Sequence, residues 1–205
     1  MIVAALTGGI GAGKSEALEA FRRAGSGTVA LDAIAHELAD KGAPVWRAVV
    51  RAFGREVLDA RGRLDRRRLA AEVFSRPALR RRLERVTHPL ILKEMRRRLR
   101  ALERAGARVA VVDVPLLYEA GLAPDFDLTV LVTAPLETRL ARLRGRDGMS
   151  RADALRRVRA QWPQRRKEGL ADAVIANGGS LSDLRRTVRG YQRALELLSS
   201  EKKPA

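Results

Sequence analysis

Cysteine is absent from this chain of 205 residues, and aromatic side chains and long apolar runs are scarce. Without cysteine the chain forms no disulfide bond and no thiolate metal site, as is usual for a cytoplasmic protein. No apolar run reaches the roughly 18 residues that a membrane helix requires, and the apolar segment directly after Met1 leaves no room for a signal peptide. We therefore expect a cytoplasmic globular protein with no membrane partner.

Lysine is also scarce, although the formal net charge is +17. Only six of the 41 basic residues are lysines, and the arginines are spread over many predicted helices rather than gathered in one block. The net charge suggests a nucleic-acid partner, but dispersed charge is typical of solvated helix faces. Aromatic residues make up 4% of the chain, too few for a platform on which bases stack. We expect no nucleic-acid partner and keep a nucleic-acid-binding ATPase as an alternative.

The most informative segment is Gly8–Ser15, which reads GGIGAGKS and follows the apolar run at residues 2–6. Four free positions between a glycine and Gly-Lys-Ser are the pattern of a phosphate-binding loop. A buried strand leads into a turn whose amides point inward, and the next helix directs its positive dipole end at the phosphates. We expect Lys14 to reach the β- and γ-phosphates and Ser15 to bind magnesium; a glycine-rich turn that binds nothing is the alternative. The residues predicted to bind the nucleotide here are Gly9, Gly11, Ala12, Gly13, Lys14, Ser15 and Glu16.

Short apolar runs without polar alternation predict strands that are covered on both faces. They lie at residues 2–6, 28–31, 108–113 and 128–132, with a weaker one at 173–176. Helical segments separate them, which predicts a doubly wound α/β fold of three layers with a parallel sheet.

Residues 33–107 contain no strong strand signal and predict a helical insertion that would bind the substrate. We expect helices to begin at Pro44, after Asp65 and near Pro77. Pro89 is expected to break or kink the third of these helices.

A second helical block, at residues 136–162, is divided by an Asp-Gly pair. Arg139, Arg142 and Arg146 fall at spacings of three and four and therefore share one helix face. Arginine-rich helices with a glycine hinge are what a mobile lid over phosphates would use. The alternative is a pair of solvated surface helices joined by a turn.

Two aspartates end predicted strands, at the edge of the sheet where ligands bind in such folds. Asp113 ends the run VAVVD. An apolar strand that ends in an aspartate has the form of the second nucleotide-binding motif, in which the carboxylate helps to hold magnesium. The next residues are Val114 and Pro115 rather than a glutamate that could activate water, and motifs of the NKxD and LSGGQ types are absent. These absences favour phosphate transfer to a small acceptor. Asp32 is the best-placed carboxylate to accept the proton of an acceptor hydroxyl; capping a helix that begins at Ala33 is the alternative.

Taken together, these residues make the chain resemble the dephospho-CoA kinase family from Ile2 to about Gly190. The matching segments are LTGGIGAGKS, LDAIAHEL, FSRPALRRRLERVTHP, VVDVPLLYEAGL, the RL-x-x-RD element and ADAVIANGGS. The phosphate loop is shared by many families, whereas VPLLYE, THP and ADAVIAN in combination are specific to this one. The resemblance implies a P-loop nucleoside triphosphate hydrolase/kinase fold. It also implies transfer of the ATP γ-phosphate to the ribose 3′-hydroxyl of dephospho-CoA, the last step of coenzyme A synthesis.

The resemblance further implies roles for single residues and regions. The implied catalytic residues are Asp32 as base, Lys14, and Arg142 as a lid arginine that contacts phosphate. Arg142, Arg146 and Asn177 complete the implied ATP site, with Asn177 near the adenine. The implied acceptor site consists of Asp32, His88, Leu116, Leu117, Tyr118 and Glu119, and the metal site, for Mg²⁺, of Ser15 and Asp113. Residues 1–32, 108–135 and 163–199 would form the nucleotide-binding core, 33–107 the CoA-binding domain, 136–162 the lid and 200–205 a disordered tail. The sequence does not determine the oligomeric state, and a monomer is favoured.

Two positions depart from the family pattern. The family has Asp-Ala-Asp after the second strand, whereas this chain has Ala30, Leu31 and Asp32, so that the retained aspartate aligns with the catalytic one. Ala176 replaces an aspartate that precedes the terminal asparagine in the family. We expect Ala30 to alter magnesium or ribose contacts without removing the base. Another small-molecule kinase, acting on nucleosides or nucleotides, is the nearest alternative.

Overall fold

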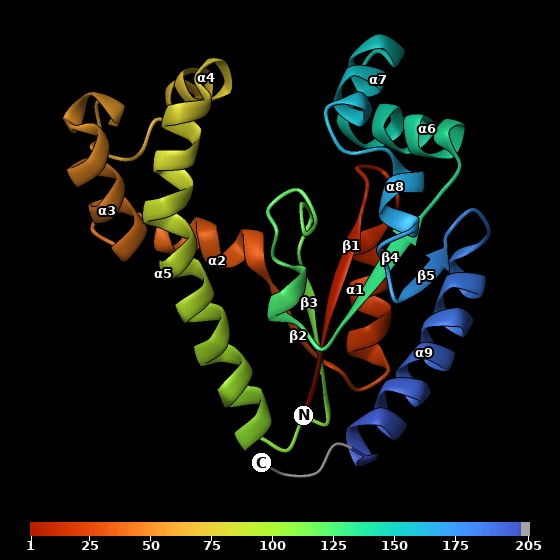
Figure 1. Ribbon diagram of the computed structural model, residues 1–205. Helices are drawn as coiled ribbons and strands as arrows, with labels where there is room; N and C mark the ends of the chain where they lie inside the picture. The colour runs from red at the N-terminus through yellow and green to blue at the C-terminus, as the bar shows by residue number, and fades with distance from the viewer. Residues whose placement is uncertain (202–205) are drawn as a thin grey trace. The chain divides into compact units, whose positions relative to one another are not determined.

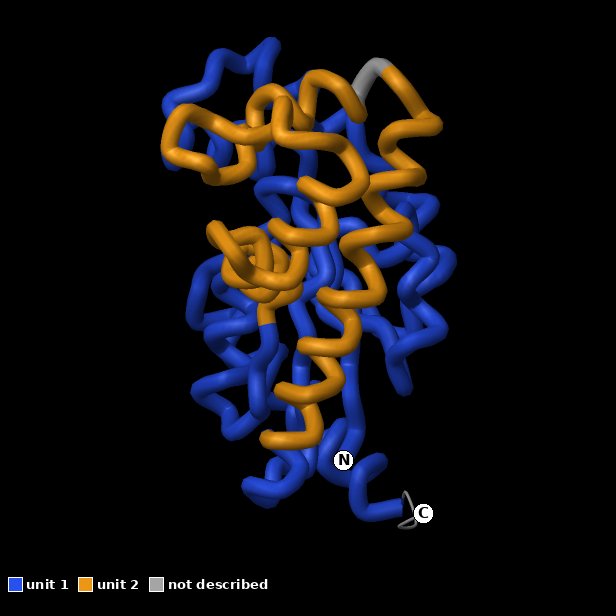
Figure 2. The backbone as a smooth tube through the Cα atoms, turned by 90° about the vertical axis from the view of Figure 1, so that its left-hand side faces the viewer, with its two compact units in different colours: residues 1–29, 102–205 blue, residues 30–101 orange. Residues whose placement is uncertain are grey.

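The computed structural model describes residues 1–201, without the side chains of residues 74 and 75, and the chain divides into two units. Unit 1 comprises Met1–Val29 and the chain from Leu102 onward, and unit 2 comprises Ala30–Ala101 (Figure 2). Unit 2 is therefore an insertion in the chain of unit 1. No helix within the described residues combines the length and the apolar character needed to cross a membrane.

Unit 1 is built around a five-stranded sheet with the strand order β2-β3-β1-β4-β5. The strands are β1 (Ile2–Gly8), β2 (Gly27–Ala30), β3 (Val109–Asp113), β4 (Leu128–Thr133) and β5 (Ala173–Ala176) (Figure 1). β1 pairs in parallel with β3 and β4, and β4 pairs in parallel with β5. The predicted strands are confirmed, with ends shifted by at most two residues, because uninterrupted apolar runs suit strands buried on both faces.

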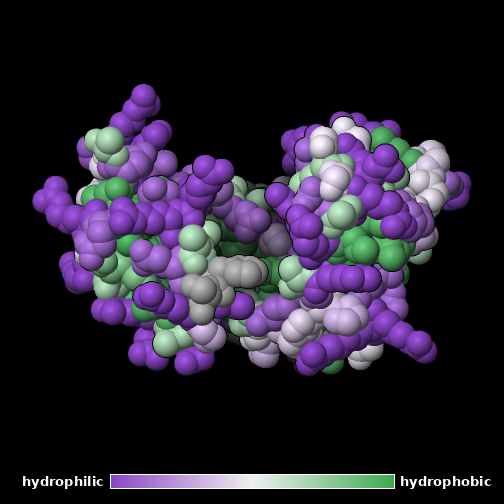
Figure 3. Space-filling model, turned by 90° about the horizontal axis from the view of Figure 1, so that it is seen from above, coloured by the Kyte–Doolittle hydropathy of each residue, from purple (hydrophilic) through white to green (hydrophobic). Residues whose placement is uncertain are grey.

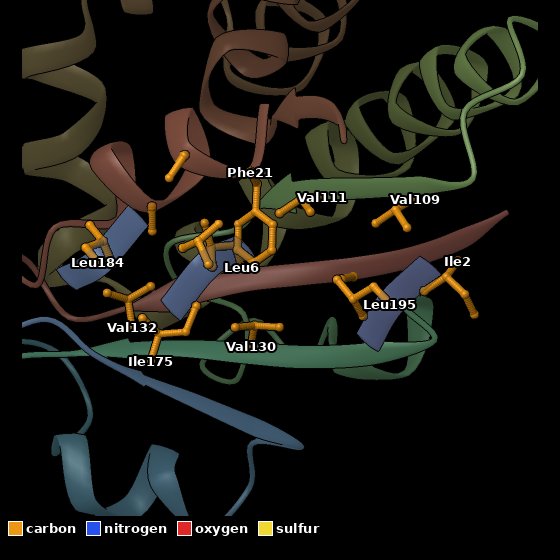
Figure 4. Packing of buried hydrophobic residues seen from close by; sticks show 14 of the residues in the cluster. Ile2, Leu6, Phe21, Val109, Val111, Val130, Val132, Ile175, Leu184 and Leu195 are labelled. Atoms are coloured by element: carbon orange, nitrogen blue, oxygen red, sulfur yellow. The ribbon is translucent and has the colours of Figure 1, made fainter. Parts of the chain in front are cut away.

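Two helices, α1 (Lys14–Arg23) and α9 (Leu181–Glu201), pack against each other and against the sheet. Figure 4 shows strand side chains pointing toward Phe21 of α1 and toward Leu184 and Leu195 of α9. Phe21 is completely buried, and burial of such a side chain stabilises a fold by about 1.5–3 kcal/mol. This core fixes β1 and α1, the two elements that the phosphate loop connects.

The remaining helices of unit 1 follow β3 and β4. They are η2 (Ala123–Asp125), α6 (Leu136–Asp147), α7 (Arg151–Arg159) and α8 (Gln164–Glu168). The predicted division of the second helical block is confirmed, since Gly148 ends α6 with φ of +63° and the Ser150 side chain caps α7. Leu140, Leu143 and Ala154 form the core between α6 and α7.

The end of α9 corrects one prediction. Ser200 and Glu201 are helical, not part of the disordered tail that we predicted at residues 200–205. The Ser200 hydroxyl donates to the carbonyl of Glu196, and Arg108 contacts both residues, which extends the helix. Residues 202–205 lie outside the described part of the chain.

Unit 2 consists mainly of helices in its described residues. Its elements are α2 (Leu31–Leu38), α3 (Pro44–Phe53), η1 (Arg55–Val57), α4 (Arg66–Ser75) and most of α5 (Pro77–Arg104). The helix starts predicted at Pro44 and after Asp65 are confirmed, and the Asp65 carboxylate accepts a hydrogen bond from the Arg68 amide as an N-cap.

We predicted a break or a kink at Pro89; α5 continues through this residue, so there is no break, and the kink stays a prediction. A proline inside a helix costs about 3 kcal/mol because it lacks the N–H and crowds the preceding turn. Leu83 lies before Pro89, and Leu90 and Ile91 lie after it, yet all three pack on one cluster that contains Val49. Packing of both halves on the same core opposes a break.

Hydrophilic residues cover most of the face in Figure 3. Most of the surface ion pairs join two residues of the same helix. In α5 the Glu94 carboxylate accepts hydrogen bonds from Arg97 and Arg98, which lowers the pKa of Glu94 to about 2. Arg98 also pairs with Glu37 of α2. Such pairs are typical of solvated helix faces.

Candidate active site

The predicted phosphate loop connects β1 to α1 in unit 1. β1 ends at Gly8, and α1 begins at Lys14 after Gly13, which has φ of +91°. Since β1 lies between β3 and β4, the loop leaves the middle of the sheet at the edge where ligands bind in such folds. The unpaired amides and the positive dipole end of α1 lie directly after the loop. This is the arrangement that an anion requires.

Neighbouring groups occupy the space beside three loop glycines. A Cβ at Gly13 would lie 2.0 Å from Nδ2 of Asn177, and one at Gly9 would lie 2.5 Å from Nη2 of Arg139. Gly11 has φ of +78°, and its Cβ would lie 2.8 Å from the carbonyl oxygen of Arg139. The loop therefore needs glycine both for its backbone path and for these close contacts.

Lys14 and Asp113, which come from two separate motifs, lie together. β1 and β3 pair with Leu6 opposite Asp113, which brings the end of β3 beside the start of the loop. Nζ of Lys14 lies 3.4 Å from Oδ1 of Asp113. The structure thus places a cation and a carboxylate where the phosphates of a nucleotide would bind.

Two oxygen donors at this position suit magnesium. Ser15 follows Lys14 at the start of α1, and Asp113 ends β3; hydroxyl and carboxylate oxygens are hard donors that Mg²⁺ accepts. In the described residues no group of three or more His, Cys, Asp and Glu side chains could hold a metal. Phosphate oxygens and water would have to complete the coordination, as is usual for Mg²⁺ at nucleotides.

Arg142 and Asn177 contact the loop backbone and each other. Nη1 of Arg142 donates to the carbonyl of Ala12 at 3.2 Å, and its Nη2 donates to the carbonyl of Asn177 at 3.0 Å. Nδ2 of the buried Asn177 donates to the same Ala12 carbonyl at 2.8 Å. The structure therefore brings together the loop, helix α6 of the predicted lid and the residue after β5, although the sequence separates them widely.

Two residues that we did not include in the predicted site also bind the loop. Nε of Arg139 donates to the Ile10 carbonyl at 2.9 Å, and the Ile10 amide donates to Oε1 of Gln161 at 2.8 Å. Arg139 shares a predicted helix face with Arg142, which is the signal that could have found it. Gln161 follows α7 and carries no such signal.

Arg146 and Glu16, both predicted to bind ATP, are exposed. Arg146 forms an ion pair with the adjacent Asp147 rather than with the loop. Glu16 lies in the first turn of α1. Their roles in ATP binding stay predictions.

One of the four predicted acceptor residues in the VPLLYE segment is exposed. Leu116 is 43% exposed, whereas Leu117 is completely buried. The Tyr118 hydroxyl donates to Oγ1 of Thr129, and burial raises the pKa of Tyr118. We interpret Leu117 and Tyr118 as residues that anchor the segment, so that Leu116 is the side chain of these three that an acceptor could reach.

Glu119, the fourth predicted acceptor residue of the VPLLYE segment, forms a buried ion pair with Lys167 of α8. Oε1 of Glu119 lies 2.6 Å from Nζ of Lys167, and the two side chains are 10% and 1% exposed. The same oxygen accepts a hydrogen bond from the Trp162 amide at 3.1 Å. Trp162 follows Gln161, which binds the loop, so the Glu119 carboxylate joins the predicted acceptor segment to the end of the predicted lid.

Asp32 and His88 belong to unit 2. Asp32 is exposed in the first turn of α2, which begins at Leu31, with Ala30 at the N-cap position. The alternative that Asp32 caps a helix beginning at Ala33 is therefore wrong. His88 is half-buried in α5. The catalytic role of Asp32 and the acceptor contact of His88 stay predictions.

Comparison with known proteins assigns the chain to a family. The family model described as Dephospho-CoA kinase matches residues 1–183. The chain belongs to this family. A dephospho-CoA kinase of Syntrophotalea carbinolica is 43% identical over 185 residues, which cover 90% of this chain and 88% of the relative.

Solved structures are similar over the whole chain. TT1252 from Thermus thermophilus is 36% identical with a TM-score of 0.79, covering 99% of this chain and 98% of that one. The dephospho-CoA kinase from Campylobacter jejuni is 25% identical with a TM-score of 0.67, covering 98% of both chains. The predicted α/β P-loop kinase fold and the resemblance to ATP-dependent dephospho-CoA kinases are confirmed.

Proposed function

We propose that the chain transfers the γ-phosphate of ATP to the ribose 3′-hydroxyl of dephospho-CoA and releases coenzyme A and ADP. This reaction is the final step of coenzyme A biosynthesis. The match of the dephospho-CoA kinase family model to residues 1–183 carries the proposal. The glycine loop between β1 and α1, with Lys14 beside Asp113, supplies the donor site that the reaction needs.

In our proposal the donor side works by positioning and electrostatics, which dominate phosphoryl transfer. The loop amides and the amino end of α1 hold the β- and γ-phosphates, and Lys14 places its charge beside them. Arg142 extends from α6 to the Ala12 carbonyl, and from there its charge would stabilise the transferring group. Asn177, beside Ala12, would border the adenine.

Ser15 and Asp113 would hold Mg²⁺. When bound, the ion neutralises charge on the phosphate oxygens. The Asp113 carboxylate lies beside Lys14 at the end of β3. The hydroxyl of Ser15 follows on the first turn of α1.

We assign the acceptor to unit 2 and to Leu116, with Asp32 as the group that orients the 3′-hydroxyl and accepts its proton. Residues 136–162 would act as a lid, because α6 and the turn after α7 bind the loop through Arg142 and Gln161. We further propose a cytoplasmic monomer that has no nucleic-acid partner.

A comparison of acceptors with the purified protein tests the proposal. ADP release is measured with ATP and Mg²⁺ in the presence of dephospho-CoA, of nucleosides or of nucleoside monophosphates. We expect ADP release that depends on dephospho-CoA, is abolished by EDTA and is restored by excess Mg²⁺. Preference for a nucleoside acceptor would overturn the assignment of the substrate. ATP hydrolysis stimulated by DNA or RNA, with a steep salt dependence, would favour the ATPase alternative.

A further inference from the structure

Arg139 of α6 is packed directly against the phosphate loop. Its guanidinium occupies the space beside Gly9, where a Cβ would lie 2.5 Å from Nη2, and its Nε donates to the Ile10 carbonyl at 2.9 Å. Its own carbonyl oxygen lies 2.8 Å from the position of a Cβ on Gly11. One residue therefore contacts three consecutive positions of the loop.

Arg139 is also a buried cation that no carboxylate neutralises among the described residues. It is 6% exposed, and its side chain bonds to a neutral backbone carbonyl rather than to an acid. Lys14, by contrast, lies beside Asp113. Burial lowers the pKa of Arg139, but a guanidinium stays protonated in proteins. A buried charge without a counter-charge is unfavourable, so the free protein holds a positive charge that an anion would stabilise.

We infer that Arg139 is a positioning residue of the nucleotide site, which holds the Ile10 peptide and whose charge the nucleotide phosphates neutralise. The inference rests on the proposed function, because it requires ATP on the loop. The hydrogen bond from Nε of Arg139 holds the Ile10 carbonyl toward α6. The charge acts through a largely buried environment, where electrostatic interactions are stronger than in water. Arg139 also connects helix α6 of the proposed lid to the donor site.

The variant Arg139→Met tests this inference, with Arg144→Met as the matched control on an exposed position of the same helix. Calorimetry measures the dissociation constant of Mg²⁺–ATP without acceptor, and thermal unfolding is followed for the ligand-free protein. We expect Arg139→Met to weaken ATP binding by roughly tenfold or more, since each tenfold corresponds to about 1.4 kcal/mol. The unfolding temperature of the ligand-free protein should stay equal or rise, because an unpaired buried charge has been removed. The control should change neither quantity.

A purely structural role predicts the opposite pattern. The ligand-free protein would then unfold at a lower temperature, while the folded fraction would bind ATP as the wild type does, and that result would overturn the inference. The variants Arg139→Lys and Arg139→Gln separate the effect of the charge on ATP binding from the effect of the hydrogen bond. They also test the inference if Arg139→Met does not fold. The Arg139→Lys variant should bind ATP more tightly than the Arg139→Gln variant. Equal ATP affinities of the two variants would contradict the role of the charge. Wild-type protein without dephospho-CoA-dependent ADP release would refute the proposed function instead, and the affinity comparison would still apply.

Discussion

Substitution of Lys167 by methionine should destabilise the protein strongly. The side chain of Lys167 is 1% exposed, and its Nζ lies 2.6 Å from Oε1 of Glu119, whose side chain is 10% exposed. Methionine keeps the length and most of the volume of the side chain, so that cavity formation contributes little. In this variant the Glu119 carboxylate would still accept the hydrogen bond from the Trp162 amide. It would no longer have the positive charge of Lys167 beside it.

The size of the effect follows from this burial. Removal of one partner from a buried ion pair costs about 3–5 kcal/mol because an uncompensated charge remains. For a chain of this length each kcal/mol lowers the unfolding temperature by roughly 2–4 °C, so Lys167→Met should unfold roughly 6–20 °C below the wild type. Thermal unfolding by circular dichroism at neutral pH measures this difference.

The double variant Lys167→Met, Glu119→Gln provides the decisive comparison. It removes both charges, and the glutamine oxygen can still accept the hydrogen bond from Trp162, so most of the lost stability should return. A loss below about 1 kcal/mol in Lys167→Met, typical of exposed pairs, would refute the reasoning. So would a double variant that is as unstable as the single one. The KM of the double variant for dephospho-CoA then shows whether Glu119 anchors the segment, with KM unchanged, or contacts the acceptor, with KM raised.

Three further predictions concern single residues. Asp32→Asn should lower kcat by roughly 100-fold or more if the carboxylate accepts the acceptor proton, with ATP affinity little changed; near-normal turnover would remove Asp32 from this role. Arg142→Ala should slow phosphate transfer in single-turnover experiments far more than it weakens dephospho-CoA binding, and an effect on acceptor affinity alone would contradict its proposed lid role. Glu94 has a pKa of about 2, lowered from 4.5 by Arg97 and Arg98, so its stabilising effect is complete above pH 4.5 and is lost as the pH falls toward 2. Urea unfolding across this range should show Glu94→Gln losing less stability than the wild type, by about 1 kcal/mol or less because Arg97 is exposed; equal losses would contradict this.

The strands and the phosphate loop could be predicted because local patterns encode them. Apolar runs such as the one at residues 109–113 suit only strands covered on both faces, and the loop pattern requires a preceding strand and a following helix. Lys14 and Asp113 could be assigned to one nucleotide site in advance, although not as an ion pair, because each follows or ends a parallel strand at one edge of the sheet. The family-specific segments then indicated dephospho-CoA as the acceptor. The loop alone cannot indicate the acceptor, because many kinase families share it.

The sequence by itself therefore determined the α/β class, the donor loop and the family. Tertiary structure alone decided what surrounds the loop, since Arg139 and Ile10 are 129 positions apart and Gln161 and Ile10 are 151 apart. Periodicity shows that Arg139 and Arg142 share a helix face, but only the packing of α6 places that face on the loop rather than in solvent. Lys167 likewise reads as a surface lysine until the fold buries it against Glu119. The physical reason is that helical spacing specifies which side chains lie together on one element, whereas their partners depend on how the elements pack.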